Sequence, residues 1–136
     1  MKLGAIVLDT DNVEELSDFY AKMLGWTKSS QIHKGKKWIT VIKADYMETP
    51  LVFQENHDYI HPVWPSNEDK QQQMLHMDFY VRADEFEEKV EHAIKCGARI
   101  AETQFTSDWK VMLDCSGHPF CIIPIPKEIY EQRYGS

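Results

Sequence analysis

The feature that most limits the possible folds of this chain is that its two halves repeat one pattern. Each half contains a short β-prone run, then apolar residues at helical spacing, then a glycine placed to end the helix. Asp11 and Asp84, 73 residues apart, precede the two predicted helices, and Gly25 and Gly97, 72 residues apart, follow them. The separation drifts to 69 residues at Pro50 and Pro119. A slow drift of this kind is typical of a duplicated unit that has lost a few loop residues.

Each half is predicted to fold as β-α-β-β-β. The first strands are expected at Lys2 to Leu8 and Leu75 to Val81, and each helix is expected to begin at a capping box, Asp11 with Glu14 and Asp84 with Glu87. Three further β-prone runs follow each helix, at residues 27–32, 37–42 and 50–54, and at residues 99–105, 109–113 and 120–125. The helix of such a unit covers one face of its sheet, so we predict an α+β fold of two tandem modules whose curved sheets enclose a common cleft.

The chain is expected to form one domain over residues 1–136, with module one at about 1–58, a linker at 59–73, module two at about 74–126 and a tail at 127–136. The linker carries several aromatic residues, among them Trp64. Two interpretations of the linker are possible: its aromatic residues pack on the outside of a sheet, or the segment lies over the mouth of the cleft.

Charge and cysteine content narrow the classes of partner. The chain has 15 basic and 22 acidic residues, for a net charge of -7, which disfavours binding to phosphate backbones. No apolar run is long enough to span a bilayer, and the N-terminus does not resemble a signal segment. Three cysteines without zinc-finger spacing suit a reducing compartment. We therefore expect a cytoplasmic protein that binds neither nucleic acid nor membrane.

The order of the motifs resembles the vicinal oxygen chelate superfamily, which includes glyoxalase I, extradiol dioxygenases, fosfomycin-resistance transferases and bleomycin-resistance proteins. The resemblance extends from about Leu3 to Ile125 and is closest to glyoxalase-like domains without an assigned activity. It is specific for the fold but not for a reaction, because this fold supports unrelated chemistries. The motifs that carry it are DFYAKMLGW at Asp18–Trp26, LHMDFYV at Leu75–Val81, CGA at Cys96–Ala98 and DCSGHPFCII at Asp114–Ile123.

The resemblance also suggests where a metal would be bound. Metal-using members take ligands from the first and last strands of each repeat, which correspond here to Leu3, Val52, His76 and Cys121. Leucine and valine cannot coordinate a cation, so the resemblance implies neither the usual divalent metal nor another cofactor. The alternative is a metal-dependent lyase or dioxygenase that uses Glu55 with His76.

The alternation of side chains along strands predicts the lining of the cleft. His76 and Asp78 share the cleft face with Tyr80 and are candidates for an acid–base pair, although hydrogen bonds to neighbouring strands would give them a purely structural role. Cys121 as a nucleophile paired with His76 is a further option. The residues expected to contact a ligand are Leu3, Ala5, Val52, Gln54, Tyr80, Cys121 and Trp64.

Three functional readings follow from this lining. The first is a binding protein for a small organic molecule, acting as a sequestering or sensing module or as a weakly specialised enzyme. The second is the metal-dependent enzyme described above. The third is an interaction protein whose cleft packs against a partner chain. A homodimer is expected, because superfamily members often pair modules across chains and free edge strands invite pairing.

Overall fold

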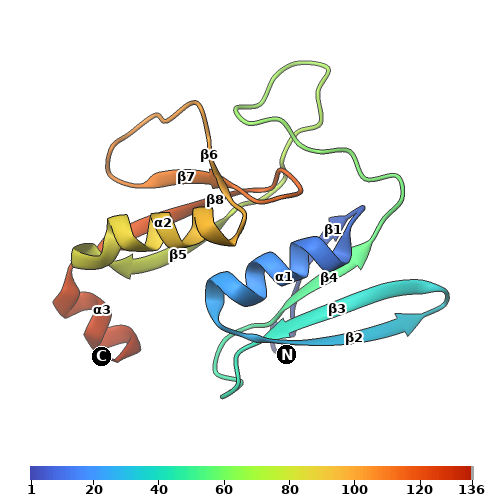
Figure 1. Cartoon of the computed structure of the whole chain (residues 1–136), viewed down its shortest axis with the longest axis horizontal. Coiled ribbons are helices and arrows are strands. Elements are labelled where there is room, and N and C mark those ends of the chain that lie inside the picture. Colours follow the sequence, from blue (N-terminus) through green and yellow to red (C-terminus); the bar gives the residue numbers. More distant parts are fainter. Residues whose placement is uncertain (136) are drawn as a thin grey trace. The chain divides into compact units, whose positions relative to one another are not determined.

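The computed structural model describes residues 1–135 (Figure 1). Its contacts divide the chain into two units, Met1–Ile60 and the part from His61 onward, called module one and module two below. Linker residues 61–73 therefore belong with module two. Each module contains one four-stranded sheet, and the two sheets have the same strand order, β1-β4-β3-β2 and β5-β8-β7-β6. This equivalence confirms the predicted α+β duplication.

In module one the first and last strands run parallel, and the other neighbouring strands are antiparallel. Strand alternation places Leu8, Ile39 and Phe53 on the buried face, where α1 packs against the sheet. Tyr20 of the helix is fully buried and stacks on Phe53 with ring centroids 5.4 Å apart. The elements are β1 (Ile6–Thr10), α1 (Val13–Leu24), β2 (Thr27–His33), β3 (Lys36–Ile42) and β4 (Leu51–Glu55).

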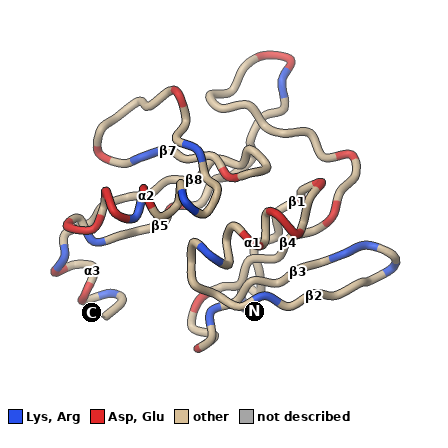
Figure 2. The backbone as a smooth tube through the Cα atoms, viewed as in Figure 1, with Lys and Arg blue, Asp and Glu red and all other residues tan. Residues whose placement is uncertain are grey.

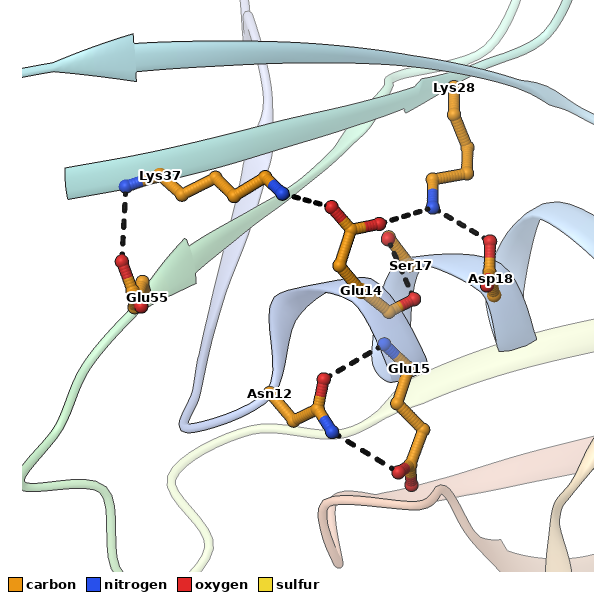
Figure 3. Close-up of polar contacts among 8 residues, drawn as sticks. All are labelled: Asn12, Glu14, Glu15, Ser17, Asp18, Lys28, Lys37 and Glu55. Atoms are coloured by element: carbon orange, nitrogen blue, oxygen red, sulfur yellow. Dashed lines mark hydrogen bonds and ion pairs between the residues drawn. The ribbon is translucent and has the colours of Figure 1, made fainter.

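The first helix begins one residue later than the predicted capping box. Asn12 is the N-cap: its side-chain oxygen accepts from the backbone N–H of Glu15 at 3.1 Å, and its amide donates to the Glu15 carboxylate at 3.3 Å (Figure 3). The prediction of Asp11 was wrong because β1 continues to Thr10, leaving Asp11 in the turn. The predicted helix end is confirmed, since Gly25 adopts φ 70°.

Ion pairs join α1 to the strands beside it (Figure 3). Lys28 bonds Asp18 at 2.7 Å and Glu14 at 3.3 Å, and Lys37 also bonds Glu14. Hydrogen bonds from the two lysines lower the pKa of the Glu14 carboxyl below its ordinary range. The two carboxylates are exposed and the two lysines are partly exposed, so each pair contributes little to stability.

Module two repeats the sheet but departs from the predicted helix start. A 3-10 turn, η1 (Ala83–Glu85), precedes α2. The Asp84 carboxylate does not cap the helix; its Oδ1 accepts a hydrogen bond from Arg82 Nε at 3.0 Å. Gly97 has the predicted positive φ, 125°. The remaining elements are β5 (Met77–Arg82), α2 (Phe86–Cys96), β6 (Arg99–Ile100), β7 (Lys110–Leu113), β8 (Pro119–Ile125) and α3 (Lys127–Tyr134).

Strand β6 is much shorter than the predicted run over residues 99–105. The Gln104 side chain takes over the pairing beyond it: its amide donates to the carbonyls of Ala101 and Val111 at 2.9 and 2.8 Å, and its oxygen accepts from the Val111 N–H at 2.9 Å. The side chain thus satisfies backbone groups that a longer strand would have paired.

The C-terminal segment, expected as a tail, contains helix α3, which contacts β5. Acidic residues follow the outer side of α2, where Glu87, Glu88 and Glu91 are exposed (Figure 2). Across residues 1–135, none of the helices has both the length and the apolar character needed to cross a bilayer.

Candidate functional site

The face of the second sheet that α2 leaves uncovered carries a polar cluster. Asp78 and Tyr80 of β5 are exposed, as is His76 immediately before that strand, whereas Phe79 lies on the other face and packs edge-on against Phe120. Asp78 lies directly opposite Cys121 in the parallel pairing of β5 with β8. The predicted strand parity is therefore correct, and the pairing brings a third polar group to His76 and Cys121.

The three side chains of this cluster, His76, Asp78 and Cys121, approach one another closely. His76 Nε2 lies 3.4 Å from Asp78 Oδ1, so the two side chains lean together along the strand. One ligand atom from each of the three residues lies within 4.8 Å of the other two. His76 and Asp78 are 48% and 39% exposed at their side chains, while Cys121 is 8% exposed. The buried Cys121 thiol therefore has a fixed position, whereas the more exposed side chains of His76 and Asp78 can change rotamer.

The environment of Cys121 opposes ionisation of its thiol. Burial, the negative charge of Asp78 and a hydrogen bond with Asp78 together raise the pKa of Cys121 to about 11. At pH 7 only about one thiol in ten thousand is ionised. Because the thiolate is the reactive form, this geometry weighs against Cys121 as a nucleophile.

Trp64 of the linker packs on the same face of the second sheet. It contacts the buried cluster of Ala101, Val111 and Cys121, and its ring meets Phe105 edge-on with centroids 6.3 Å apart. The indole nitrogen of Trp64 is buried and has no hydrogen-bond partner within the described residues. The aromatic linker therefore forms an apolar wall beside the polar cluster of module two.

Module one offers no metal donor at the corresponding strand positions. In the first sheet Val7 lies opposite Val52, and in the second sheet Asp78 lies opposite Cys121, so Val7 corresponds to Asp78. His76 precedes Asp78 by two residues, and its counterpart two residues before Val7 is therefore Ala5. The predicted counterpart, Leu3, was two residues out of register; Leu3 lies before β1 and is 71% exposed.

The other predicted residues of module one lie on β4. Val52 and Gln54 are partly exposed on the open face of the first sheet, as their parity predicts. Glu55 has the opposite parity, that of the fully buried Phe53. Its carboxylate accepts from the Lys37 backbone N–H at 3.3 Å. The position of Glu55 therefore weighs against its use as a metal ligand on the open face.

The turn before β8 is a structural site. The fully buried Asp114 carboxylate accepts from the N–H groups of Ser116 and His118 at 2.9 and 3.0 Å, and His118 Nδ1 lies 2.9 Å from its second oxygen. These contacts fix the turn that precedes β8, the strand that contains Cys121. The geometry gives His118 a structural role in this turn.

Sequence reasoning considered His76 with Asp78, and His76 with Cys121, but never all three together. The strands that carry Asp78 and Cys121 are separated by most of a module in the sequence. Only the interstrand register shows that the two residues face each other. The alternation of side chains along the strands was the only sequence signal for this cluster. It placed His76, Asp78 and Cys121 on one face of the sheet but gave no distances between them.

The comparisons with known proteins concern almost the whole chain. A family model described as a glyoxalase-like domain matches residues 5–123. No curated protein matches the sequence.

Solved structures with similar folds share little sequence with this chain. Glyoxalase I of Leishmania major, titled as trypanothione-dependent, has a TM-score of 0.67 at 13% identity, over 98% of this chain and 92% of that one. The genomically encoded fosfomycin resistance protein FosX of Listeria monocytogenes has a TM-score of 0.65 at 15% identity, over 98% and 96%. A glyoxalase/dioxygenase of Nostoc punctiforme has a TM-score of 0.63 at 20% identity, over 93% and 92%. At these identities the likeness establishes the fold alone.

Proposed function

Because this chain belongs to the glyoxalase-like domain family, within the glyoxalase, bleomycin resistance and dioxygenase superfamily, we propose that it binds a small organic molecule on the open face of the second sheet. The observation that carries the proposal is the cluster of His76, Asp78 and Cys121 beside the Trp64 wall. A few convergent polar groups next to an apolar surface are the usual composition of a ligand site.

Each group has a distinct role in this proposal. The Asp78 carboxylate accepts a hydrogen bond from the ligand, and His76, 3.4 Å away, donates or accepts according to its tautomer. Trp64 and the exposed ring of Tyr80 contact the apolar body of the ligand. The preferred ligand is therefore an apolar or aromatic molecule that carries at least one hydrogen-bond donor.

Module one contributes no metal ligand in this proposal. Ala5 and Val52, the positions of module one that correspond to His76 and Cys121, have no donor atoms, so binding is proposed to proceed without a metal ligand from module one. Ligand contacts by Leu3, Ala5, Val52 and Gln54 stay predictions, as do the homodimer and the cytoplasmic location.

A second candidate function is proton transfer. The 3.4 Å approach of His76 Nε2 to Asp78 Oδ1 is the arrangement in which a carboxylate orients an imidazole as a general base. A substrate with an acidic C–H or O–H group seated on the cluster would be required. Deuterium exchange from such a compound, followed by NMR, distinguishes catalysis from simple binding.

A thermal-shift screen of chelator-treated protein tests the binding proposal. A ligand present at 100 times its Kd stabilises the protein by about 2.7 kcal/mol. We expect His76→Ala and Asp78→Asn to reduce the shift, while the control His92→Ala, an exposed histidine on α2, retains it. Hits whose shifts survive both cluster substitutions would place the ligand elsewhere, and a screen without hits would favour the interaction-protein reading.

A further inference from the structure

We propose that His76, Asp78 and Cys121 form a site for a thiophilic divalent cation, such as Zn²⁺, within module two alone. The site differs from the one that the duplication predicts, because it takes no ligand from module one and adds Asp78 as its third ligand. It goes beyond the proposed function, since organic-ligand binding and cation binding are separable properties of the same face.

The spacing of the donor atoms suits a tetrahedral cation. Metal–nitrogen and metal–oxygen bonds of about 2.0 to 2.1 Å at tetrahedral angles place two ligand atoms roughly 3.4 Å apart. His76 Nε2 and Asp78 Oδ1 are 3.4 Å apart. The Cys121 sulfur lies within 4.8 Å of these two atoms. In a tetrahedral site the sulfur and nitrogen ligands are roughly 3.5 Å apart, so His76 and Asp78 would have to move toward the sulfur by about 1 Å. The exposed His76 and Asp78 side chains can make that adjustment by rotation.

The donor types select the class of cation. One imidazole nitrogen, one carboxylate oxygen and one thiolate sulfur favour Zn²⁺, Co²⁺ or Ni²⁺ over Mg²⁺ and Ca²⁺, which prefer oxygen ligands throughout. Binding of the cation displaces the Cys121 proton to solvent, after which a neutral imidazole and two anionic ligands balance the charge of a divalent cation. Three protein ligands leave the fourth position for water or an organic molecule.

The surroundings support a defined site rather than a loose surface cluster. Cys121 lies in a strand paired on both sides, opposite Asp78 on β5 and Val111 on β7. Trp64 packs against the buried cluster that contains Cys121. Two of the three ligands are thus fixed by backbone pairing, and only His76 precedes the strand.

Cobalt titration of chelator-stripped protein tests the proposal directly. Co²⁺ bound to a thiolate gives a near-ultraviolet charge-transfer band, so we expect this band to saturate at one equivalent and to disappear when Zn²⁺ is added. Cys121→Ser should abolish the band, and His76→Ala and Asp78→Asn should each weaken Co²⁺ binding by at least about tenfold. The matched control Cys96→Ser, a partly exposed cysteine on α2, should leave the band unchanged.

Absence of the charge-transfer band in the wild-type protein would overturn the proposal, as would a band that survives Cys121→Ser or is lost in Cys96→Ser. Should Cys121→Ser fail to fold by circular dichroism, alkylation mapped by mass spectrometry provides a second measurement on the wild-type chain. Zn²⁺ should then slow modification of Cys121 selectively, and equal alkylation rates with and without Zn²⁺ would refute the site. Neither readout depends on an organic ligand, so a negative thermal-shift screen leaves this test intact.

Discussion

The buried thiol of Cys121 should make the stability of the protein depend on alkaline pH in a way that Cys121→Ala removes. In the folded protein the pKa of this thiol is raised from its ordinary 9.0 to about 11, mainly by burial and then by the charge of Asp78. Between these values the unfolded chain loses the thiol proton while the folded protein keeps it. A rise in pH through this window therefore favours unfolding.

The size of the effect follows from the two pKa values of Cys121. At pH 8 the thiol is protonated in both states and contributes nothing to the pH dependence. At pH 10, one unit above the unfolded pKa and one unit below the folded value, the folded state loses about 1.4 kcal/mol relative to the unfolded state. Over the whole window the loss approaches about 2.7 kcal/mol.

Urea denaturation of the wild type and of Cys121→Ala at pH 8 and pH 10, in the presence of a chelator, measures this loss. The cost of deleting the sulfur is common to both pH values, and other titrating groups act equally on both proteins, so both effects cancel in the double difference. We expect the stability advantage of the wild type over Cys121→Ala to fall by about 1.4 kcal/mol between pH 8 and pH 10.

Asp78→Asn provides the matched test of the cause. It removes the carboxylate charge and leaves burial in place, so the loss between pH 8 and pH 10 should shrink without disappearing. A wild-type advantage that is the same at both pH values would refute the raised pKa. An unchanged loss in Asp78→Asn would show that Asp78 plays no part in it.

Three further predictions concern single residues. His76→Ala should change the free energy of unfolding by no more than about 0.5 kcal/mol, because the side chain is 48% exposed, yet weaken binding of any hit from the screen; unchanged affinity by titration calorimetry would contradict this. Gly97→Val should lower the melting temperature, since φ of 125° is strained for a β-branched residue by about 1 to 3 kcal/mol; an unaltered melting temperature would refute the reasoning. Asp114→Ala should cost about 2 to 4 kcal/mol in urea denaturation, because it leaves the N–H groups of Ser116 and His118 without their acceptor, and a cost below about 1 kcal/mol would show that water replaces the carboxylate.

The local structure was largely predictable from the sequence. Apolar spacing located both helices, and Gly25 and Gly97 marked their ends correctly, because a helix stripe and a left-handed cap depend on residues close in the chain. The helix starts were less predictable. Asp11 and Asn12 are both good caps, and the choice between them depended on where β1 ends. Helix α3 was missed because its apolar residues form only a weak stripe.

Longer-range departures had causes that no sequence pattern reveals. The predicted strand at residues 99–105 stops after Ile100; beyond it, the Ala101 N–H still bonds the Val111 carbonyl, and the Gln104 side chain bonds the Val111 backbone in place of a longer strand. Two positions were possible for the linker residue Trp64, and packing against the buried cluster of Ala101, Val111 and Cys121 decided where it lies. Both outcomes depend on contacts between segments that only folding brings together.

The sequence by itself determined the duplication, the β-α-β-β-β order of each module and the shared sheet face of Asp78 and Cys121, because these follow from short-range periodicity. The tertiary structure alone decided that Ala5 corresponds to His76 and that Asp78 faces Cys121. The physical reason is that a shift of two residues between paired strands keeps every side chain on the same face. Alternation of apolar and polar residues therefore does not reveal such a shift. The interstrand hydrogen bonds, which depend on the packing of the whole module, select the register that brings His76, Asp78 and Cys121 together.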